Sequence, residues 1–421
     1  MTINERVKSF IQSKKVDKKD QRIGVEIEYI IYNKNFLRLP VNPCNHFSAN
    51  DFLNHMNVGS KMNGGYTLEP GGQLEWSSPP FRNLIDLNIS FEKHNKLLKE
   101  KIDAYDLHVL DLSLDPKYFP DDIDLIEKPK YQMMDSNMKK SGTMGQWMMR
   151  NTASVQINYD ITGSKDLEEM VFIADCLNPV AAYMFSNSPF KGGKKVGSKN
   201  YRNYIWENTD VKRCCNLINH GIVSENELID NFIDFVLKVP GIFQLNRKEM
   251  VEHSNNSLGE RLTYLESNDM LRDIDIQTAL HQIFTNVRLK NLIEVRGSDK
   301  PPFGYEMAPV AFWTGLLTVP EIRKVLLDTV SNWSLNERTA WNKKSLTLNQ
   351  KQKGPEGKSY DYWNKWAGEM ALKGLKIRDY HESRFFDNFF EIILEKGPFS
   401  IQRQSSLNHS LFKLENFFTK F

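Results

Sequence analysis

The stretch RIGVEIEYIIY, residues 22–32, decides the fold more than any other part of the sequence. Its β-branched and aromatic residues are typical of a β-strand. Because side chains alternate along a strand, Glu26 and Glu28 are expected on one face and the apolar Val25 and Ile27 on the other. Two carboxylates at this spacing lie about 7 Å apart. They are either solvent-facing side chains or, if buried, ligands for a hard cation such as Mg²⁺, which would relieve their repulsion.

Three further segments place polar side chains on one face of a predicted strand. They are the hairpin at 66–78 with Glu69 and Glu75 beside its Pro-Gly-Gly turn, the strand at 152–160 with Gln156 and Asn158, and the strand at 292–296 with Glu294 and Arg296. In such a set a glutamate can hold a metal ion, an arginine can bind phosphate or carboxylate with two hydrogen bonds, and the amides can bind an amino-acid substrate. Each pair alone also fits a plain turn or a structural ion pair.

Amphipathic periodicity predicts helices around these strands. The predicted helical segments are 84–104, 165–186, 225–238, 275–287, most of 306–348, 360–374 and 383–396, and one more strand is expected at 109–114. This mixture favours an α+β fold built on an antiparallel sheet. The segment 349–358 (NQKQKGPEGK) is the clearest linker. We expect an N-terminal lead-in at 1–21, a main domain with the site at 22–348, and a C-terminal helical extension at 349–421 packed on the same domain.

Composition and missing motifs exclude several classes of protein. The 421 residues carry a formal net charge of +2, which argues against a general binder of nucleic acid or of membrane surfaces. The N-terminus lacks the apolar core of a signal peptide and no stretch is apolar enough to span a membrane, so we expect a cytoplasmic protein. The four cysteines, Cys44, Cys176, Cys214 and Cys215, make neither a disulfide framework nor a zinc site. Walker A, GxGxxG, GxSxG and HExxH motifs do not occur in the sequence.

Basic residues outside the predicted strands add candidates for the same site. Arg150, Arg202 and Arg213 can bind anionic groups of a substrate. The loop from Lys191 to Lys199 could close over a triphosphate as a lid. A solvated lysine loop is the plainer interpretation.

Seven blocks of the sequence, taken in order, resemble the glutamate–cysteine ligases of the plant and proteobacterial type. They are GVEIEYIIY (24–32), YTLEPGGQLEWSSPP (66–80), LDLSLDPKY (110–118), MMRNTASVQINYD (148–160), NPVAAYMFSNSPF (178–190), YRNYIWENTDVKR (201–213) and VRLKNLIEVRGSD (287–299), the last running on into APVAFWTGLL (308–317). The resemblance covers about residues 22–320 and is weaker in the C-terminal helices.

The resemblance implies a glutamine-synthetase-like α+β fold, in which an antiparallel sheet forms a cradle surrounded by helices. It implies an enzyme that uses ATP and Mg²⁺ to join the γ-carboxylate of glutamate to the amine of cysteine through γ-glutamyl phosphate, the first step of glutathione synthesis. The implied metal ligands are Glu26, Glu28, Glu69, Glu75 and Glu294. The implied catalytic residues are Arg296 and Glu294, and the implied substrate- and ATP-binding residues are Arg150, Gln156, Asn158, Arg202, Trp206 and Arg213.

The chain departs from the family pattern in two places. Members often have Arg directly before the Thr of an R-T-x-T-V-Q block, where this chain has Asn151 and places Arg150 one position earlier. The cysteines do not match the redox pairs of plant members, so no thiol switch is predicted. Three alternatives stay open: a sister ligase with another acceptor amine, including the first ligase of ergothioneine synthesis; a catalytically silent binding protein; and another metal-dependent phosphoryl enzyme, such as a guanidino kinase. The sequence is compatible with a monomer or a homodimer.

Overall fold

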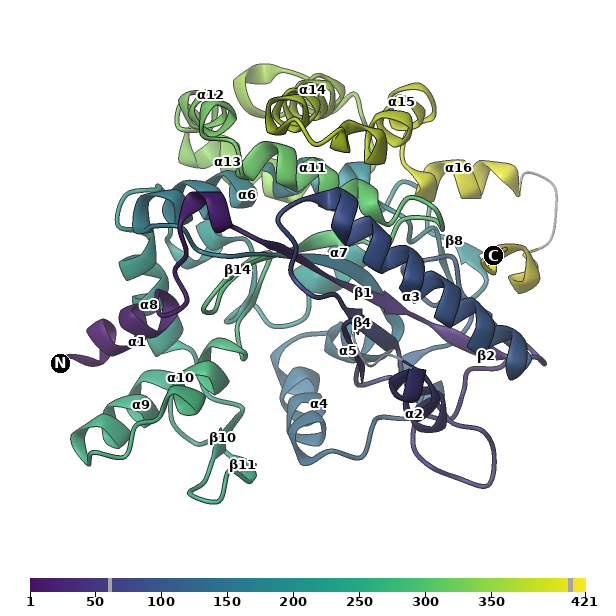
Figure 1. The fold of residues 1–421 in the computed structure, drawn as a ribbon, viewed down its shortest axis with the longest axis horizontal. Coiled ribbons are helices and arrows are strands. Elements are labelled where there is room, and N and C mark those ends of the chain that lie inside the picture. Colours follow the sequence, from purple (N-terminus) through teal and green to yellow (C-terminus); the bar gives the residue numbers. More distant parts are fainter. Residues whose placement is uncertain (60–62, 408–411) are drawn as a thin grey trace.

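Six antiparallel strands, in the order β13-β14-β6-β1-β4-β3, form a sheet through the middle of the structure (Figure 1). The computed structural model describes residues 1–59, 63–407 and 412–421. The six strands are β1 (Ile23–Tyr29), β3 (Gly65–Leu68), β4 (Leu74–Ser77), β6 (Ser154–Tyr159), β13 (Val287–Leu289) and β14 (Ile293–Asp299). The α+β fold on an antiparallel sheet, predicted from the sequence, is confirmed.

Helices and four short strand pairs surround this sheet. The helices are α1 (Ile3–Ile11), α2 (Ala49–Gly59), α3 (Leu84–Ala104), α4 (Pro129–Ser141), α5 (Gly145–Asn151), α6 (Ser164–Met184), α7 (Tyr201–Glu207), α8 (Leu228–Lys238), α9 (Leu258–Ser267), α10 (Asp273–Leu280), α11 (Met307–Leu317), α12 (Pro320–Val330), α13 (Leu335–Lys344), α14 (Tyr360–Arg378), α15 (Asp387–Lys396) and α16 (Phe399–Ser406). The short pairs are β2 (Ile31–Asn33) with β5 (Leu107–Val109), β7 (Phe190–Lys191) with β8 (Lys194–Lys195), β9 (Cys214–Cys215) with β12 (Phe284–Thr285), and β10 (Phe243–Leu245) with β11 (Val251–His253).

The apolar face of the sheet is buried beneath helices. Val25, Ile27 and Tyr29 of β1 are at most 2% exposed, and α3, α6 and α11 contact strands of the sheet. On α3, the buried His94 lies within hydrogen-bond distance of the hydroxyl groups of Tyr29 (3.0 Å) and Tyr66 (2.8 Å). The alternation predicted for β1 is therefore present, with its apolar residues in the core and its carboxylates on the opposite face.

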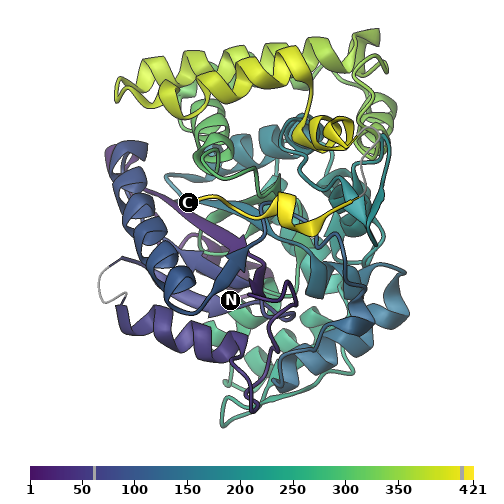
Figure 2. The same ribbon diagram turned by 90° about the vertical axis from the view of Figure 1, so that its right-hand side faces the viewer.

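Helices α11 to α16 lie together on one side of the sheet (Figures 1 and 2). Helix α14 packs against α11 and α6, and Tyr360 Oη donates to the carbonyl oxygen of Pro179 at 2.6 Å. The segment 349–358, predicted as a linker, is a packed loop, because Pro355 O accepts from the indole of Trp363 (3.2 Å). Apolar side chains of α14 and α15 belong to the same hydrophobic core as those of β1.

The predicted helix at 275–287 is wrong beyond Leu280, where α10 ends. The chain turns there, and β12 pairs with β9 in a parallel ladder. The side chain of Gln282 stabilises the turn, since its Oε1 accepts from the backbone N–H of Ile242 at 2.8 Å. This contact with a distant segment carries no local sequence signal.

The predicted strand at 109–114 is also mostly wrong, because β5 ends at Val109. Beyond it, Leu110 and Leu114 form only single β-bridges, with Phe418 and Thr152. The other predicted helices and strands are present, with ends that differ by a few residues.

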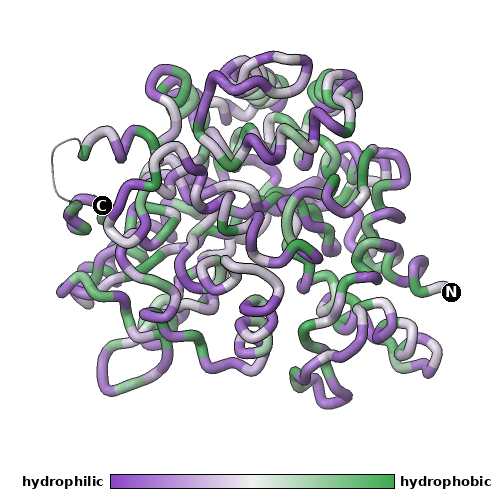
Figure 3. Tube along the Cα trace, turned by 180° about the vertical axis from the view of Figure 1, so that it is seen from behind, coloured by the Kyte–Doolittle hydropathy of each residue, from purple (hydrophilic) through white to green (hydrophobic). Residues whose placement is uncertain are grey.

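Among the residues that the structure describes, no helix is both long and apolar enough to cross a membrane. Figure 3 shows hydrophobic and hydrophilic residues interspersed along the helices.

Candidate active site

The polar face of the sheet lines a cavity of about 220 Å³. Strands β1, β4, β6, β13 and β14 of the sheet contribute one wall, and α4, α5, α7, β10 and β12 contribute the rest of the lining. Nine of the residues predicted for the site line this cavity: Glu26, Glu28, Glu69, Glu75, Gln156, Arg202, Trp206, Glu294 and Arg296. The sheet thus brings together side chains that lie far apart in the sequence.

Four glutamates, Glu26, Glu28, Glu69 and Glu75, form what we call the carboxylate wall of the cavity. Of these, Glu28 is 8% exposed. Its Oε2 accepts from the backbone N–H of Ser154 at 2.8 Å, and its Oε1 accepts from the side-chain amide of Gln156 at 2.9 Å. Across the β1–β4 pair, Glu28 stands directly opposite Glu75. Hydrogen bonds from β6 therefore hold the buried carboxylate of Glu28 next to the half-buried one of Glu75.

The other carboxylates of this wall have fewer partners. Glu26 Oε1 accepts from the amide of Asn158 at 3.0 Å, and Glu75 Oε1 accepts from the hydroxyl of Thr67 at 3.0 Å. Asn158 thus does not line the cavity itself but orients Glu26, which does. The carboxylate of Glu69 makes no hydrogen bond to any residue that the structure describes.

Burial raises the pKa of all four carboxyl groups, Glu26, Glu28, Glu69 and Glu75, and neighbouring carboxylates add to the effect. Burial and then Glu69 raise the pKa of Glu28 to about 7. Burial followed by Glu69, Glu26 and Glu28 raises the pKa of Glu75 well above its ordinary value. In the described part of the chain none of the four forms a salt bridge. Bound cations would relieve this unfavourable concentration of charge.

The donor chemistry of these carboxylates fits Mg²⁺, a hard cation that takes oxygen ligands. Within residues 1–59, 63–407 and 412–421, however, no three His, Cys, Asp or Glu side chains converge closely enough to form a metal site. The carboxylates are spread along the cavity instead. Carboxylate side chains are suitable ligands for a metal ion. Their positions in this structure, however, do not define a coordination geometry.

Glu294 differs from the other carboxylates because cations surround it. Its Oε2 lies 2.6 Å from Nε of Arg288 and 2.9 Å from Arg296, and its Oε1 lies 2.7 Å from Nζ of Lys290. Although burial alone would raise it, these three cations hold the pKa of Glu294 well below its ordinary value. A metal ion at Glu294 would have to replace at least one of them.

Arg296 is aimed across the sheet by a β-bulge. The register of β14 against β6 shifts between Val295 and Ser298, so that an extra residue is accommodated beside Gln156. The guanidinium of Arg296 donates to Gln156 Oε1 at 2.5 Å and to Glu294 Oε2 at 2.9 Å. Both partners hold the arginine in one orientation next to the carboxylate wall.

Arg202 and Trp206 of α7 supply hydrogen-bond donors that have no partner. Arg202 is 4% exposed and lies 3.6 Å from Asp299, but its Nε is unpaired among the described residues, as is the indole N–H of Trp206. The guanidinium groups of Arg202 and Arg296 lie 5.8 Å and 5.6 Å from the centre of the Trp206 ring. Buried donors without a partner are costly, so an anionic group of a substrate is well suited to this place.

Two arginines predicted for the site do not reach the cavity. Arg213, 1% exposed, donates to Asp210 Oδ2 at 2.7 Å and to two backbone carbonyls. Arg150 donates to Asp135 Oδ1 at 2.9 Å on α4. Asn151, which stands where the family often has Arg, donates to the carbonyl of Tyr118 at 2.9 Å. Neither Arg150 nor Asn151 lines the cavity.

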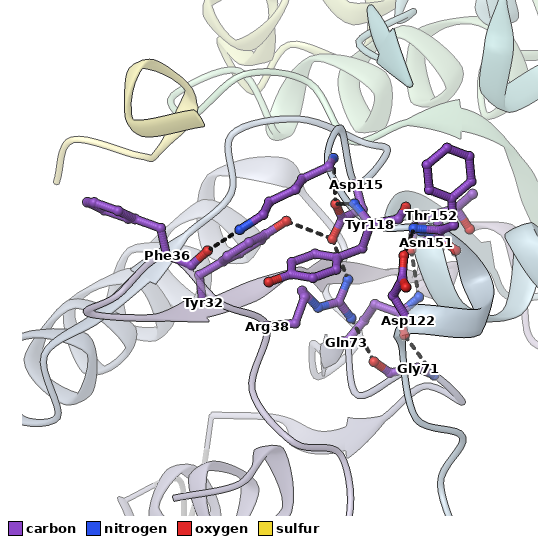
Figure 4. A network of polar contacts seen from close by, with 12 residues as sticks. Tyr32, Phe36, Arg38, Gly71, Gln73, Asp115, Tyr118, Asp122, Asn151 and Thr152 are labelled. Carbon is purple, nitrogen blue, oxygen red and sulfur yellow. Dashed lines mark hydrogen bonds and ion pairs between the residues drawn. The ribbon is translucent and has the colours of Figure 1, made fainter. Parts of the chain in front are cut away.

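A polar network holds the turn that carries Glu69 between β3 and β4 (Figure 4). The side-chain amide of Gln73 donates to the carbonyl of Thr152 at 2.9 Å, and its Oε1 accepts from the N–H of Gly71 at 3.0 Å. The guanidinium of Arg38 donates to the carbonyl of Gly71 at 2.7 Å. The turn is thus fixed to the start of β6 before any ligand binds.

The same network extends away from the cavity and fixes Arg38 (Figure 4). Asp115 pairs with Arg38 at 2.9 Å and accepts from the hydroxyl of Tyr32 at 2.7 Å. Gly71 is required at the turn because a Cβ there would lie 2.5 Å from the Cα of Arg150. The carboxylate wall and α5 therefore meet backbone to backbone.

Several residues that line the cavity were not predicted from the sequence. They are Lys130, Tyr131, Met134, Met148, Met149, Phe243, His281, Phe284, Arg288 and Lys290. Most lie on α4, α5 and β10, which reach the cavity only through tertiary packing. Pro129, at the first position of α4, is the one local signal of a helix start there.

The loop from Lys191 to Lys199, considered as a lid, does not line the cavity. It contains the short hairpin β7–β8. Nζ of Lys191 lies 4.7 Å from the centre of the Trp147 ring and 5.2 Å from that of Tyr201. The lysine is thus held between two aromatic rings and not over the carboxylates.

Comparison with known proteins identifies relatives over most of the chain. Residues 22–367 match the model of glutamate-cysteine ligase family 2. The chloroplastic glutamate–cysteine ligase of Medicago truncatula is 29% identical over 347 residues, which cover 82% of this chain and 67% of the relative. The chloroplastic enzyme of Nicotiana tabacum is 29% identical over 330 residues, covering 78% and 63%. The chain thus spans about two thirds of the length of these relatives.

Solved structures show a similar fold at low sequence identity. The glutamate–cysteine ligase of Francisella tularensis, solved in complex with AMP, matches with a TM-score of 0.61 and 10% identity over 96% of this chain and 88% of its own. A bifunctional glutathione synthetase from Pasteurella multocida matches with a TM-score of 0.52 and 13% identity over 96% of this chain and 50% of its own. These likenesses concern the fold alone.

Proposed function

This chain belongs to glutamate–cysteine ligase family 2, and from that premise we propose that it couples ATP hydrolysis to joining the side-chain carboxylate of glutamate and the amine of cysteine. The observation that carries the proposal is the cavity on the polar face of the sheet. In it, the buried Glu28 and the half-buried Glu26, Glu69 and Glu75, all with raised pKa, share one lining with Arg296 and with donors of α7 that have no partner among the described residues. This arrangement suits a nucleotide with divalent ions and an anionic substrate.

The proposed reaction has two steps. An oxygen of the glutamate γ-carboxylate attacks the γ-phosphorus of ATP, the bond to the ADP oxygen breaks, and γ-glutamyl phosphate forms. The amine nitrogen of cysteine then attacks the acyl carbon, phosphate leaves with the bonding electron pair, and the amine loses a proton. Such chemistry requires positioning and charge neutralisation more than a protein nucleophile.

We assign roles to the cavity residues on the basis of their chemistry. Arg296, oriented by Gln156 and Glu294, faces the phosphoryl group during transfer and offsets the negative charge that develops on it. Arg202 and Trp206 bind a carboxylate of glutamate through their unpaired donors. Asn158 acts through Glu26.

The proposed Mg²⁺ ligands are Glu26, Glu28, Glu69 and Glu75. Glu294 would join them if its contact with Lys290 were given up. Bound Mg²⁺ would neutralise the phosphate oxygens of ATP and make the γ-phosphorus more electrophilic.

The remaining parts of the proposal concern the whole protein. We place the reaction at the first step of glutathione synthesis and in the cytoplasm. We treat residues 22–348 as the catalytic domain and 349–421 as an extension of it, because α14 packs directly on α11 and α6.

Release of ADP in the presence of Mg²⁺, glutamate and cysteine, with each omitted in turn, tests the proposal. We expect turnover only in the complete mixture, and mass spectrometry should detect γ-glutamylcysteine. Replacing cysteine by other amines at constant glutamate determines the acceptor. The proposal is wrong if the protein releases no ADP with any amine, or if turnover does not require glutamate.

A further inference from the structure

The wall of the cavity opposite the carboxylates contains an unpaired lysine. Lys130 lies in the first turn of α4 and lines the cavity. It forms no salt bridge and no hydrogen bond with any residue that the structure describes, and its Nζ lies 4.7 Å from the centre of the neighbouring Tyr131 ring. Burial lowers the pKa of Lys130, while the carboxylate of Glu69 favours its charged form. A positive charge is thus held at the cavity with no fixed partner.

The surroundings of Lys130 favour a phosphate as its partner. Among the charged groups around it, the carboxylate of Glu69 most strongly favours the charged form of Lys130, against the effect of burial on its pKa. The arginine cluster around Trp206 lies next to Glu28, whose charge both Arg202 and Arg296 influence. The N-terminal turn of α4 also presents the positive end of the helix dipole to the cavity. Lys130 thus adds a cation to the cavity, in addition to Arg202 and Arg296.

Arg150 connects this turn to the rest of the cavity. Its guanidinium donates to Asp135 Oδ1 (2.9 Å) on α4 and to the carbonyl of Pro120 (3.3 Å). Both Arg150 and Asp135 are less than 9% exposed. The backbone of Arg150 packs so closely on Gly71 that only glycine fits there. One residue thus ties α4 to the hairpin that carries Glu69.

We infer that α4 is a phosphate-binding wall, in which Lys130 donates to a phosphate oxygen of the nucleotide and Arg150, a positioning residue, holds α4 in place through Asp135. The inference rests on the proposed use of ATP and assigns a nucleotide phosphate to the side of the cavity that α4 lines.

Nucleotide binding tests the role of Lys130 directly. The affinity for the magnesium complex of β,γ-imido-ATP, measured by calorimetry, should fall about 10- to 100-fold in Lys130→Met, as expected for a lost charge-assisted hydrogen bond. Lys140→Met is the matched control, because Lys140 lies on the exposed side of the same helix. The control should bind like the unmodified chain. Unchanged binding in Lys130→Met, or a loss confined to glutamate, overturns the inference.

The unmodified chain separates this inference from the proposed function. If it neither binds the nucleotide analogue nor releases ADP, both are wrong. If it does both while Lys130→Met is unaffected, only the role of Lys130 is wrong.

A double-mutant cycle tests the role of Arg150. Arg150→Met and Asp135→Asn should each raise KM for ATP about fivefold or more, and the double variant should be no worse than the more affected single one, since both changes remove the same contact. Arg150→Lys should restore part of the loss. Lower thermal stability with unchanged KM for ATP in the folded variants shows a structural role only and overturns the positioning role. Asp135→Asn preserves side-chain shape and keeps the test usable if Arg150→Met does not fold.

Discussion

Glu28 of β1 and Glu75 of β4 stand directly opposite each other in the antiparallel sheet, and within the described residues neither forms a salt bridge. Like charges facing each other across a strand pair destabilise a sheet. The proposed function explains this arrangement, because bound Mg²⁺ would neutralise the two carboxylates during the reaction.

Replacement of one carboxylate should therefore separate stability from activity. In Glu75→Gln without Mg²⁺ at pH 8, we expect the free energy of unfolding to rise on the order of 1–2 kcal/mol, because a half-buried carboxyl group next to other carboxylates is replaced by a neutral one. We expect the rate of ADP release to fall about a hundredfold or more. Thermal denaturation and a coupled ADP assay measure the two effects. Glu127→Gln, at an exposed position, is the control and should change neither. Normal turnover in Glu75→Gln would remove this residue from the proposed site.

Two of the arginines assigned to the site by resemblance, Arg202 and Arg213, lie in different surroundings and give a second prediction. Arg213→Met leaves the buried Asp210 without its cation, so the free energy of unfolding should fall by about 3–5 kcal/mol. KM for glutamate and for ATP should stay unchanged in the protein that remains folded. In Arg202→Met, KM for glutamate should rise instead. A large effect of Arg213→Met on KM with normal stability would contradict the structural role of Arg213.

The turn between β3 and β4 gives a third prediction. In Gly71→Ala the added Cβ would meet the backbone of Arg150 at 2.5 Å, so the turn must move, at a cost of about 1–3 kcal/mol. Since the turn carries Glu69, turnover should fall as well. Gly65→Ala, where a Cβ would have nothing within 4 Å, is the matched control and should leave turnover unchanged. If both substitutions change the turnover rate equally in steady-state assays, the close approach at Gly71 is not needed for activity.

A fourth prediction concerns pH. Burial raises the pKa of Glu207 from an ordinary value of 4.5 to about 7. The folded chain therefore binds a proton more tightly there than the unfolded chain does. The stabilisation linked to that proton is fully present below pH 4.5 and is lost as the pH rises through 7.

Glu207→Gln should remove this dependence. Relative to the unmodified chain, the variant should gain stability between pH 4.5 and 7, by up to about 3 kcal/mol, and the gain should stay constant above pH 7. Urea denaturation at a series of pH values without Mg²⁺ measures it, and the exposed Glu391→Gln serves as control. A stability difference that does not vary with pH would show that Glu207 is ionised normally.

The carboxylate wall could be predicted from the sequence because strand alternation is a local property. Once β1 is identified, Glu26 and Glu28 must share a face. The same alternation places Glu294 and Arg296 of β14 on one face. The opposite wall could not be predicted in this way. Lys130 and Phe243 reach the cavity only because α4 and β10 pack beside the sheet, and no local pattern encodes that packing.

The direction of long side chains was equally beyond prediction. Arg150 and Arg213 are each close in sequence to residues that line the cavity. Each nevertheless donates to a buried aspartate, Asp135 or Asp210, and the sequence does not identify these aspartates as partners. The end of α10 at Leu280 has a similar cause, because the ladder between β12 and β9 depends on a distant segment. Such tertiary contacts override helical periodicity.

The strict alternation along β1 limits how this protein can change during evolution. Inserting or deleting one residue between Ile23 and Glu28 would exchange the two faces of the strand. Carboxylates would then point into the hydrophobic core and isoleucine into the cavity. Folding and chemistry would fail together. Length variation among descendants of this chain should therefore accumulate in surface loops, while the spacing within this strand stays constant.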